Sequence, residues 1–590
     1  MPFQAPVRDL LFALTEIVDV GQLSATEAFA ELDRETMSAV LDAAAALSND
    51  VLAPLNRPGD VAGASYQNGK VTAAPGFAEA YKLFAEGGWN GLAADPEYGG
   101  QGLPKALELA MFETVHAANM AFGLCPMLTQ GAIEAIHAHG TDRQKKLFLP
   151  KMIAGEWTGA MNLTEPQSGT DLGALRTRAE PDGDGGYRLF GQKIFITWGD
   201  HDCTDNIVHL VLARLPDAPA GSRGISLFLA PKQLVNEDGG LAGPNDLRPG
   251  SIEHKLGIHA SPTCVMLFEG AKAELVGQAN NGLAHMFTMM NAARLSVGVQ
   301  GVAIAERAYQ QALEYALERR QGRSAWSGEN NAPIFDHPDV RRMLAGMKAR
   351  IEAARAICLL TAVSADLANA APDAETRAAA RLREEVLTPI AKAWSTDAGV
   401  EIASLGVQIH GGMGFIEETG AAQHYRDARI APIYEGTNGV QAMDLAGRKL
   451  GLEDGEGARA LIADMRAGAA ALIDHLDDRL APIGQRLDAA VDAAEAATEW
   501  LSARRGEPDA LAGATAYLKL MGDTVGGWLL GKGALAAADG RVGDEAYGEA
   551  RVALASHYAE TVLAQAPGQT PAITAGADTL KALDAAALGR

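Results

Sequence analysis

The segment from residue 408 to 441 holds a carboxylate in surroundings that suit acid–base chemistry. It reads QIHGGMGFIEETGAAQHYRDARIAPIYEGTNGVQ, and within it Glu435 follows an Ile-Tyr pair and precedes a glycine. A carboxylate beside apolar residues is partly desolvated, which raises its pKa and makes it a better base near neutral pH. Glu435 is therefore a candidate general base. An equally good interpretation is a first-turn glutamate stabilised by a helix dipole, with Thr437 or Asn438 as the helix cap.

A second polar stretch, MNLTEPQSGTDLGALRTRA, covers residues 161–179. Thr164, Ser168 and Thr170 supply hydroxyl groups, and Gly169 allows a ligand to approach the backbone closely. This composition suits a loop that binds a polar cofactor. It is equally typical of a capped loop that joins a helical region to a strand, because Thr, Ser and Gly are ordinary loop residues.

Several common catalytic motifs are excluded. The stretch GGWLLGKG, residues 526–533, resembles a phosphate-binding loop but ends in glycine, so it lacks the hydroxyl that would bind magnesium. The sequence contains no Gly-x-Ser-x-Gly, His-Glu-x-x-His or Gly-x-Gly-x-x-Gly pattern. Hydrolase, zinc and nicotinamide functions therefore have no support, and we expect no metal site.

Composition and charge narrow the possible partners and location. The chain has 590 residues, with 50 Lys and Arg against 74 Asp and Glu, and this net charge of -24 disfavours nucleic acid. No apolar stretch approaches the roughly 18 residues of a membrane span, and we expect no signal peptide. The four cysteines lie far apart and form no zinc-binding pattern, so a cytoplasmic location fits best.

The order of predicted elements gives the fold class. Apolar residues recur at helical spacing in residues 1–155 and again in 279–452, whereas residues 156–278 contain short β-rich runs such as IVHLVLARL. Residues 453–590 are rich in alanine and predict an additional helical domain. The chain is therefore mainly α with a central β-domain and a C-terminal helical extension, and a Rossmann core is not supported.

Three separated segments together resemble the acyl-CoA dehydrogenase family, over about residues 45–450. TEPQSGTD is similar to the family's flavin signature, IFIT at 194–197 to the strand that stacks on the flavin, and YRDARIAPIYEGTNGVQ to the segment with the catalytic glutamate. The resemblance implies a helical lobe, a β-barrel or sandwich and a four-helix lobe. It also implies bound FAD, an acyl-CoA substrate and electron-transferring flavoprotein as the acceptor.

The resemblance assigns roles to individual residues. Glu435 would remove the α-proton of the thioester while a hydride leaves the β-carbon for flavin N5. The alternative base position of some relatives holds Ala292 here, which cannot accept a proton. The residues implied to contact FAD are Met161, Leu163, Thr164, Gly169, Thr170, Phe195, Thr197 and Thr437, with Arg319, Gln408 and Gly412 reaching the adenylate half in a neighbouring subunit.

The same resemblance bears on the substrate and assembly. Arg294 matches an arginine near the CoA moiety, and Ser168 is a further candidate for substrate binding. Arg448 follows Glu435 by 13 residues on the expected next helix and could support the site electrostatically, although a solvated or helix-end arginine is the more common explanation. The segments YALERRQGRSAW and IYEGTNGVQAMDLAGRKL, together with the C-terminal extension, look most like a subgroup that oxidises 3-methylmercaptopropionyl-CoA, a step of dimethylsulfoniopropionate breakdown, to methylthioacryloyl-CoA. In relatives with such an extension it covers the surface where two dimers would meet, so the resemblance implies a homodimer. A general short-, medium- or longer-chain acyl-CoA dehydrogenase, or a non-catalytic protein on this fold, remains the alternative.

The methionines of HMFTMM provide a weak physical indication of a thioether substrate. Met286, Met289 and Met290 could form a soft, polarisable wall for a sulfur-containing chain. Ordinary core or interface methionines are the more common explanation of such a cluster.

Overall fold

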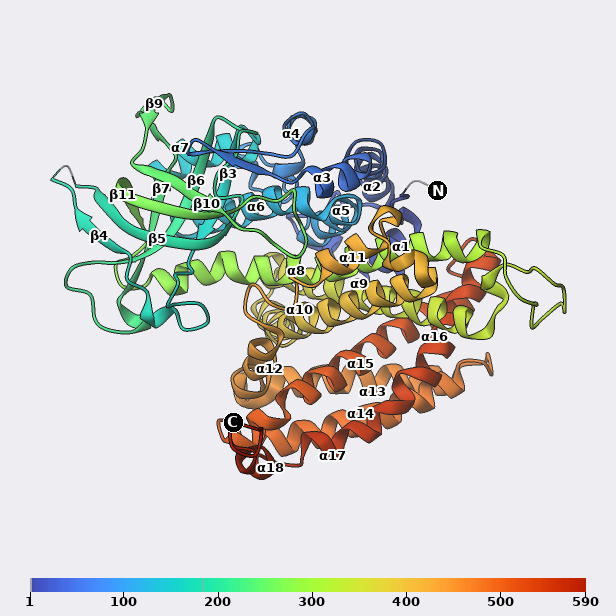
Figure 1. Ribbon diagram of the computed structural model, residues 1–590. Coiled ribbons are helices and arrows are strands. Elements are labelled where there is room, and N and C mark those ends of the chain that lie inside the picture. Colours follow the sequence, from blue (N-terminus) through green and yellow to red (C-terminus); the bar gives the residue numbers. More distant parts are fainter. Residues whose placement is uncertain (1–2, 184) are drawn as a thin grey trace. The chain divides into compact units, whose positions relative to one another are not determined.

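The computed structural model describes residues 3–183 and 185–590 (Figure 1). The first two positions of the predicted N-terminal helical domain and position 184 of the predicted β-domain lie outside the described residues. The chain forms two compact units, one of residues 44–104 and 118–293, the other of residues 3–43, 105–117 and 294–590. The predicted N-terminal helical region thus contributes to both units, and the boundaries drawn from the sequence remain predictions.

The first of these units contains the strands. Seven strands form the main sheet, and β1 with β2 and β8 with β9 form two small antiparallel pairs. The strands are β1 (Ser65–Gln67), β2 (Lys70–Thr72), β3 (Trp157–Asn162), β4 (Arg178–Pro181), β5 (Tyr187–Thr197), β6 (Asn206–Arg214), β7 (Ile225–Pro231), β8 (Gln233–Val235), β9 (Leu241–Pro244), β10 (Leu247–Ile252) and β11 (Thr263–Val276).

The main sheet closes on itself. Strand β11 pairs with β5, β5 with β4, β4 with β6, β6 with β7, and β7 with β11, so five strands form a ring. Strand β3 runs parallel to β6, and β10 pairs with β11 outside the ring. Closure gives each of the five ring strands two partners, while β3 and β10 remain at the edges, and alternate side chains fill the interior. Leu189, Val211, Phe228, Met266 and Phe268 belong to this core.

The early helices come from both units, and two of them begin at a clear capping signal. They are α1 (Val7–Phe12), α2 (Arg34–Leu47), α3 (Ala53–Ala62), α4 (Phe77–Glu86), α5 (Lys105–Ala118), α6 (Met120–His139) and α7 (Asp142–Ile153). At the start of α7, Thr141 and Gln144 form a reciprocal capping box, and Asn119 caps α6. Local sequence chemistry therefore sets these boundaries.

The later helices follow the β-region. They are α8 (Gly282–Glu318), α9 (Pro338–Ala370), α10 (Ala374–His410), α11 (Ala421–Ala428), α12 (Asn438–Gly447), α13 (Glu456–Ile473), α14 (Ala481–Ser502), α15 (Pro508–Ala538), α16 (Glu545–Thr561), α17 (Thr570–Ile573) and α18 (Asp578–Ala582). Helices α9 and α10 pack along each other, and α13–α16 form a bundle (Figure 1). The helical and β-rich order agrees with the predicted fold class.

Glycines allow the long helices to approach closely around the middle of α10. A Cβ on Gly301 of α8 would lie 2.5 Å from the Ser395 carbonyl oxygen, and a Cβ on Gly522 of α15 would lie 2.3 Å from the Trp394 ring. Only glycine fits at such contacts, so α10 is held between α8 and the C-terminal extension. The stretch GGWLLGKG lies inside α15, which confirms that it is not a phosphate-binding loop.

A buried cluster of charges joins distant parts of the helical unit. Arg355 of α9 donates to Glu113 of α5 at 2.6 Å and to Glu306 of α8 at 3.1 Å, and all three side chains are at most 3% exposed. Near the chain start, Asp9 accepts hydrogen bonds from Lys348 and from the Tyr547 hydroxyl, each at 2.6 Å. Arg551 of α16 pairs with Glu352 of α9 in the same region.

Among the described residues, no helix combines the length and apolar character needed to cross a lipid bilayer.

Replacing Arg355 with methionine is expected to destabilise the protein strongly. The change leaves Glu113 buried without its cation and leaves Glu306 with only its 3.7 Å pair to Lys348, and breaking such a buried pair costs about 3–5 kcal/mol. Urea unfolding followed by circular dichroism measures the loss. Arg342→Met is the control, because Arg342 is exposed and its pair with Asp339 contributes less than about 1 kcal/mol. Equal stability of the two variants would show that the buried cluster does not stabilise the fold.

Candidate active site

The segment with the flavin-like signature follows β3 directly. Met161 is half-buried at the end of this strand, Leu163 is buried, and the chain then turns at Glu165, whose backbone exchanges two 2.9 Å hydrogen bonds with Ser168. Thr164 is half-buried beside this turn. The loop therefore has a defined conformation.

The tip of this loop is open. Gly169 and Thr170 are exposed, and a Cβ built on Gly169 would meet nothing within 4 Å. Ser168, in contrast, is buried, and its hydroxyl donates to the Asp171 carbonyl oxygen at 2.7 Å. An open glycine followed by an exposed hydroxyl suits the close approach of a phosphate-bearing ligand.

A buried ion pair anchors the loop to the barrel, and this role was not predicted from the sequence. Lys193 of β5 is fully buried and donates to a Glu165 carboxylate oxygen and to the Leu163 carbonyl oxygen, each at 2.8 Å. The same carboxylate accepts hydrogen bonds from the backbone N–H groups of Arg176 and Thr177 and from the Thr177 hydroxyl. Both ends of the loop are thus tied to one carboxylate.

Electrostatics keep this pair charged. Burial alone would raise the pKa of Glu165, but the Lys193 ammonium and the donated hydrogen bonds lower it to about 2. Burial lowers the pKa of Lys193 to about 8, against the attraction of Glu165. The only sequence signal was a lysine inside the apolar strand that contains IFIT.

An aromatic side chain lies exposed near the end of β5. Phe195 has a left-handed φ of 61° and is 60% exposed, at an irregularity in the pairing of β5 with β11. The residue before it, Ile194, donates its N–H to the Thr164 carbonyl oxygen, so strand and loop are joined here. Thr197 is half-buried in the last strand position. An exposed ring beside an open glycine loop fits a large planar cofactor that carries phosphate groups, such as FAD.

In the helical unit, Glu435 lies in a tight turn before α12. Its φ is 56° and that of Gly436 is 83°, so both residues are left-handed. Thr437 is the N-cap of α12, and its hydroxyl accepts from the Val440 N–H at 3.3 Å. Glu435 is therefore not a first-turn residue, and that interpretation was wrong. A left-handed non-glycine residue is strained and is often found at functional sites.

The Glu435 carboxyl has the electrostatics of a base. It is partly buried, and desolvation raises its pKa to about 7, while the positive charges of Arg294 and Lys392 oppose this rise. Arg294 is only 8% exposed, and its Nε donates to the Glu435 carbonyl oxygen at 3.4 Å. Arg448 forms an ion pair with Asp444 at 2.7 Å, and its side chain is 56% exposed.

The structure also shows the surroundings of the other predicted residues. Arg319, Gln408 and Gly412 are all exposed on the helical unit. Met286, Met289 and Met290 are at most 8% exposed, and a Cβ on Gly131 of α6 would lie 2.9 Å from Met289. The methionines therefore pack in the core, which is the more common of the two interpretations. No group of three or more His, Cys, Asp or Glu residues in the described chain could hold a metal ion.

Glu165→Gln is expected to loosen the loop, because it leaves the fully buried Lys193 without its counter-charge. We expect the flavin-to-protein absorbance ratio after gel filtration to fall at least severalfold, with a lower melting temperature. Glu180→Gln, at an exposed ion pair with Arg178 on β4, is the matched control and should leave both values unchanged. Full flavin content in Glu165→Gln would contradict the anchoring role.

Sequence models of the acyl-CoA dehydrogenase family match most of the chain. Those described as its N-terminal, middle and C-terminal domains match residues 35–156, 160–271 and 280–450. A fourth, described as acetyl-CoA dehydrogenase C-terminal like, matches residues 461–584. The extension is thus a recognised domain.

Three relatives illustrate the similarity. A 3-methylmercaptopropionyl-CoA dehydrogenase of Ruegeria pomeroyi is 47% identical over 585 residues, covering 98% of this chain and 99% of the relative. A broad-specificity linear acyl-CoA dehydrogenase of Mycobacterium tuberculosis is 32% identical and covers 99% and 98%. The solved structure of an acyl-CoA dehydrogenase from Bacillus anthracis complexed with FAD has a TM-score of 0.74 at 22% identity, covers 95% and 92%, and shares the fold. The chain belongs to the acyl-CoA dehydrogenase family of FAD-dependent oxidoreductases.

Proposed function

We propose that this protein oxidises 3-methylmercaptopropionyl-CoA to methylthioacryloyl-CoA by α,β-dehydrogenation. The observation that carries the proposal is the 47% identity, over 98% of this chain, to a relative named for that substrate. The similarity extends through the C-terminal extension, so it includes the feature that separates this chain from shorter relatives. Short straight-chain acyl-CoA thioesters are expected as further substrates.

Glu435 is the residue that we propose accepts the α-proton. The α-proton of a thioester is a very weak acid until the carbonyl is polarised, so the base must be strong and well placed. A pKa of about 7 gives Glu435 a larger affinity for the proton than an ordinary carboxylate while much of it is still ionised at neutral pH. FAD, when bound, supplies the acceptor for the hydride that leaves the β-carbon.

The remaining residues are proposed to bind the cofactor and the CoA moiety. Arg294 is buried and cationic beside the Glu435 turn, which suits an anionic CoA thioester. Arg448 would act at longer range, and Ser168 would act through the shape of the loop, because its hydroxyl is already bound to Asp171. The ring system of FAD is proposed to contact Met161, Leu163, Thr164, Phe195 and Thr197, and its pyrophosphate to contact Gly169 and Thr170. Thr437 is proposed as a further FAD contact.

We also propose a cytoplasmic homodimer that passes electrons to electron-transferring flavoprotein. In this arrangement Arg319, Gln408 and Gly412 bind the adenylate half of the FAD of the partner subunit. These three residues are exposed, and so are three apolar side chains just after α10, Met413 at 50%, Phe415 at 86% and Ile416 at 46%. Several exposed apolar side chains close together are typical of a surface that a partner covers.

An anaerobic titration of the flavin-loaded protein with 3-methylmercaptopropionyl-CoA, butanoyl-CoA and a long-chain acyl-CoA tests the function. We expect the visible flavin band to bleach at the lowest concentration with the thioether substrate. Glu435→Gln should retain flavin but lose at least about 10²–10⁴-fold in the rate of bleaching. Because the unprotonated base is the active form, kcat/KM of the wild type should rise with pH through about pH 7.

Other outcomes of this titration have definite meanings. Preference for butanoyl-CoA or the long-chain thioester would support acyl-CoA dehydrogenation but contradict 3-methylmercaptopropionyl-CoA as the main substrate. Bleaching of Glu435→Gln at the wild-type rate would require another base. A protein that binds flavin but bleaches with no thioester would contradict the proposed function.

Arg319→Ala is expected to weaken FAD retention and the dimer together. The loss removes a cation that we propose contacts the partner's adenylate, a contact of about 1.5–3 kcal/mol when charge-assisted. Flavin content and sedimentation velocity measure both effects. Arg320→Ala removes the neighbouring exposed arginine and is the control. Unchanged FAD affinity in Arg319→Ala would refute the inter-subunit role.

A further inference from the structure

A buried lysine contacts the turn that carries Glu435. Lys392 lies in the middle of α10 and is 0% exposed. Its Nζ donates to the Gly436 carbonyl oxygen and to the Asn438 side-chain oxygen, each at 2.8 Å. These bonds reach the residue after Glu435 and the first residue of α12. A fully buried ammonium group is costly unless its hydrogen bonds are satisfied, so these contacts constrain the turn tightly.

Asn438 links the same turn to α10 through several further bonds. Its side-chain N–H group donates to the Ala393 carbonyl oxygen at 3.1 Å, to the Thr396 hydroxyl at 3.0 Å and to an Asp397 carboxylate oxygen at 2.7 Å. Its backbone N–H donates to the Pro432 carbonyl oxygen at 3.0 Å, which closes the loop before α12. The first residue of α12 is therefore fixed to one turn of α10.

Two hydrogen bonds to the backbone of Glu435 itself are longer than the bond from Lys392 to Gly436. The Glu435 carbonyl oxygen accepts from Gln441 Nε2 at 3.3 Å and from Arg294 Nε at 3.4 Å. A strained left-handed residue keeps its conformation only where surrounding contacts over-determine it. The 2.8 Å bond from Lys392 to Gly436 is the shortest of the three to this pair of carbonyl groups, and it carries a full charge.

We infer that Lys392 and Asn438 position Glu435, the proposed base. The ammonium group of Lys392 holds the left-handed turn that presents Glu435 and supplies a positive charge to the site. This inference rests on the proposed role of Glu435 and adds to it a residue that sequence motifs did not indicate. Lys392 acts through the turn that it contacts, so it is a positioning residue and not a catalytic residue.

Several charged groups face the carboxyl of Glu435 or the ammonium of Lys392. Arg294 of α8 and Lys392 of α10 act on the Glu435 carboxyl, and Asp397 of α10 acts on the Lys392 ammonium. Asp444 of α12 and Arg448, the residue after α12, act on Arg294. Burial lowers the pKa of Lys392 to about 8, opposed by the charges of Glu435 and Asp397. The lysine is therefore mostly charged at neutral pH and favours ionised Glu435.

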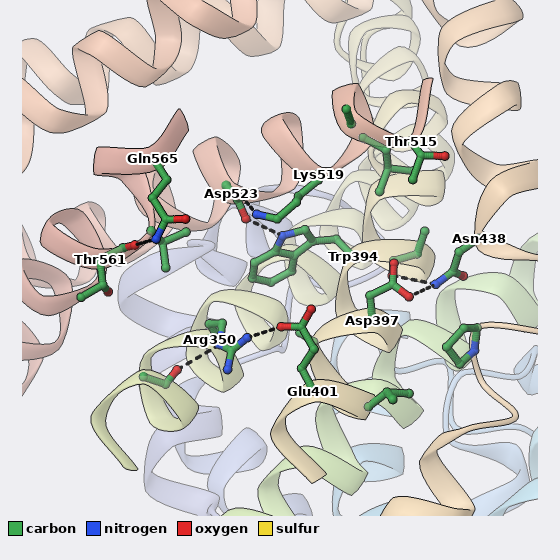
Figure 2. A pocket seen from close by; sticks show the side chains of 18 of the residues that line it. Arg350, Trp394, Asp397, Glu401, Asn438, Thr515, Lys519, Asp523, Thr561 and Gln565 are labelled. Carbon is green, nitrogen blue, oxygen red and sulfur yellow. Dashed lines mark hydrogen bonds and ion pairs between the residues drawn. The ribbon is translucent and has the colours of Figure 1, made fainter. Parts of the chain in front are cut away.

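The C-terminal extension supports this part of α10 from another side. Trp394, two residues after Lys392, donates its indole N–H to Asp523 of α15 at 2.9 Å. Trp394, Asp397 and Asn438 line a cavity of about 940 Å³ to which α15 and α16 also contribute (Figure 2). Figure 2 shows the Asp397–Asn438 and Trp394–Asp523 bonds in its wall. The extension thereby packs against α10, the helix that contacts the Glu435 turn.

Two variants separate the charge of Lys392 from its positioning effect. Lys392→Met removes both, whereas Asn438→Ala keeps the lysine charge and removes the hydrogen bonds that Asn438 forms with Lys392, Asp397 and the rest of α10. Anaerobic stopped-flow reduction of the flavin by the best thioester of the wild type is measured from pH 5.5 to 9. Lys392→Met should slow reduction about 10- to 100-fold. Because it removes a positive charge near Glu435, it should also shift the acidic limb of the rate–pH profile to higher pH by about one unit. Asn438→Ala should slow reduction about tenfold with the limb unmoved.

The controls make each outcome decisive. Lys532→Met removes a partly buried lysine of α15 remote from these bonds and should match the wild type. If Lys392→Met fails to fold or to retain flavin, Asn438→Ala tests the positioning effect alone. If a thioester reduces the wild type and both variants match its rate and pH profile, the positioning role of Lys392 and Asn438 is overturned but the proposed function is not. A wild type that no thioester reduces would instead overturn the proposed function.

Discussion

A base that takes a proton from carbon near neutral pH must be short of water and still be held in one position. Desolvation raises the pKa of Glu435 to about 7, and the charges of Arg294 and Lys392 prevent a larger rise. The conformation that presents the carboxylate is itself strained, with two successive left-handed residues. Hydrogen bonds from α8, α10 and α12 all reach this turn. The packing of the long helices at their close glycine contacts therefore fixes the conformation of Glu435.

Two glutamates of this chain illustrate how surroundings decide function. Glu165 accepts hydrogen bonds from a buried lysine, a hydroxyl and two backbone N–H groups, and its pKa falls to about 2. Glu435 has positive charges nearby, but desolvation dominates and its pKa rises to about 7. The first is suited to permanent charge and structural anchoring, the second to proton transfer. Each has a fully buried lysine nearby, but Lys193 of β5 forms an ion pair with Glu165, whereas Lys392 of α10 bonds to the residues after Glu435 and acts on its carboxyl through its charge.

Much of this arrangement could be predicted from local sequence. Helical and strand periodicity indicated the order of elements, the IFIT stretch lies in β5 as expected, and the apolar neighbours of Glu435 correctly indicated a raised pKa. The contacts that hold the site could not be predicted. Lys392 lies 44 residues before Gly436, and Lys193 lies 28 residues after Glu165, so only the packed fold brings them together.

The left-handed turn escaped prediction for a related reason. Glu435 has no intrinsic preference for a positive φ, and a first-turn position was equally consistent with a threonine and an asparagine downstream. The conformation results from tertiary hydrogen bonds that outweigh a local cost of about 1–3 kcal/mol. The closure of the barrel by β7 and β11 is likewise a long-range pairing, which periodicity along one strand does not reveal.

The charge cluster around Asp9 has a consequence for biosynthesis. Asp9 of α1 binds Tyr547 of α16, 538 residues later in the chain. At about 5–20 residues per second, a ribosome needs about half a minute to two minutes to make the intervening chain. Helix α1 therefore leaves the ribosome long before α16 is made, and Asp9 lacks its Tyr547 partner until α16 emerges. The packing of the helical unit is thus completed only after nearly all of its helices have been synthesised.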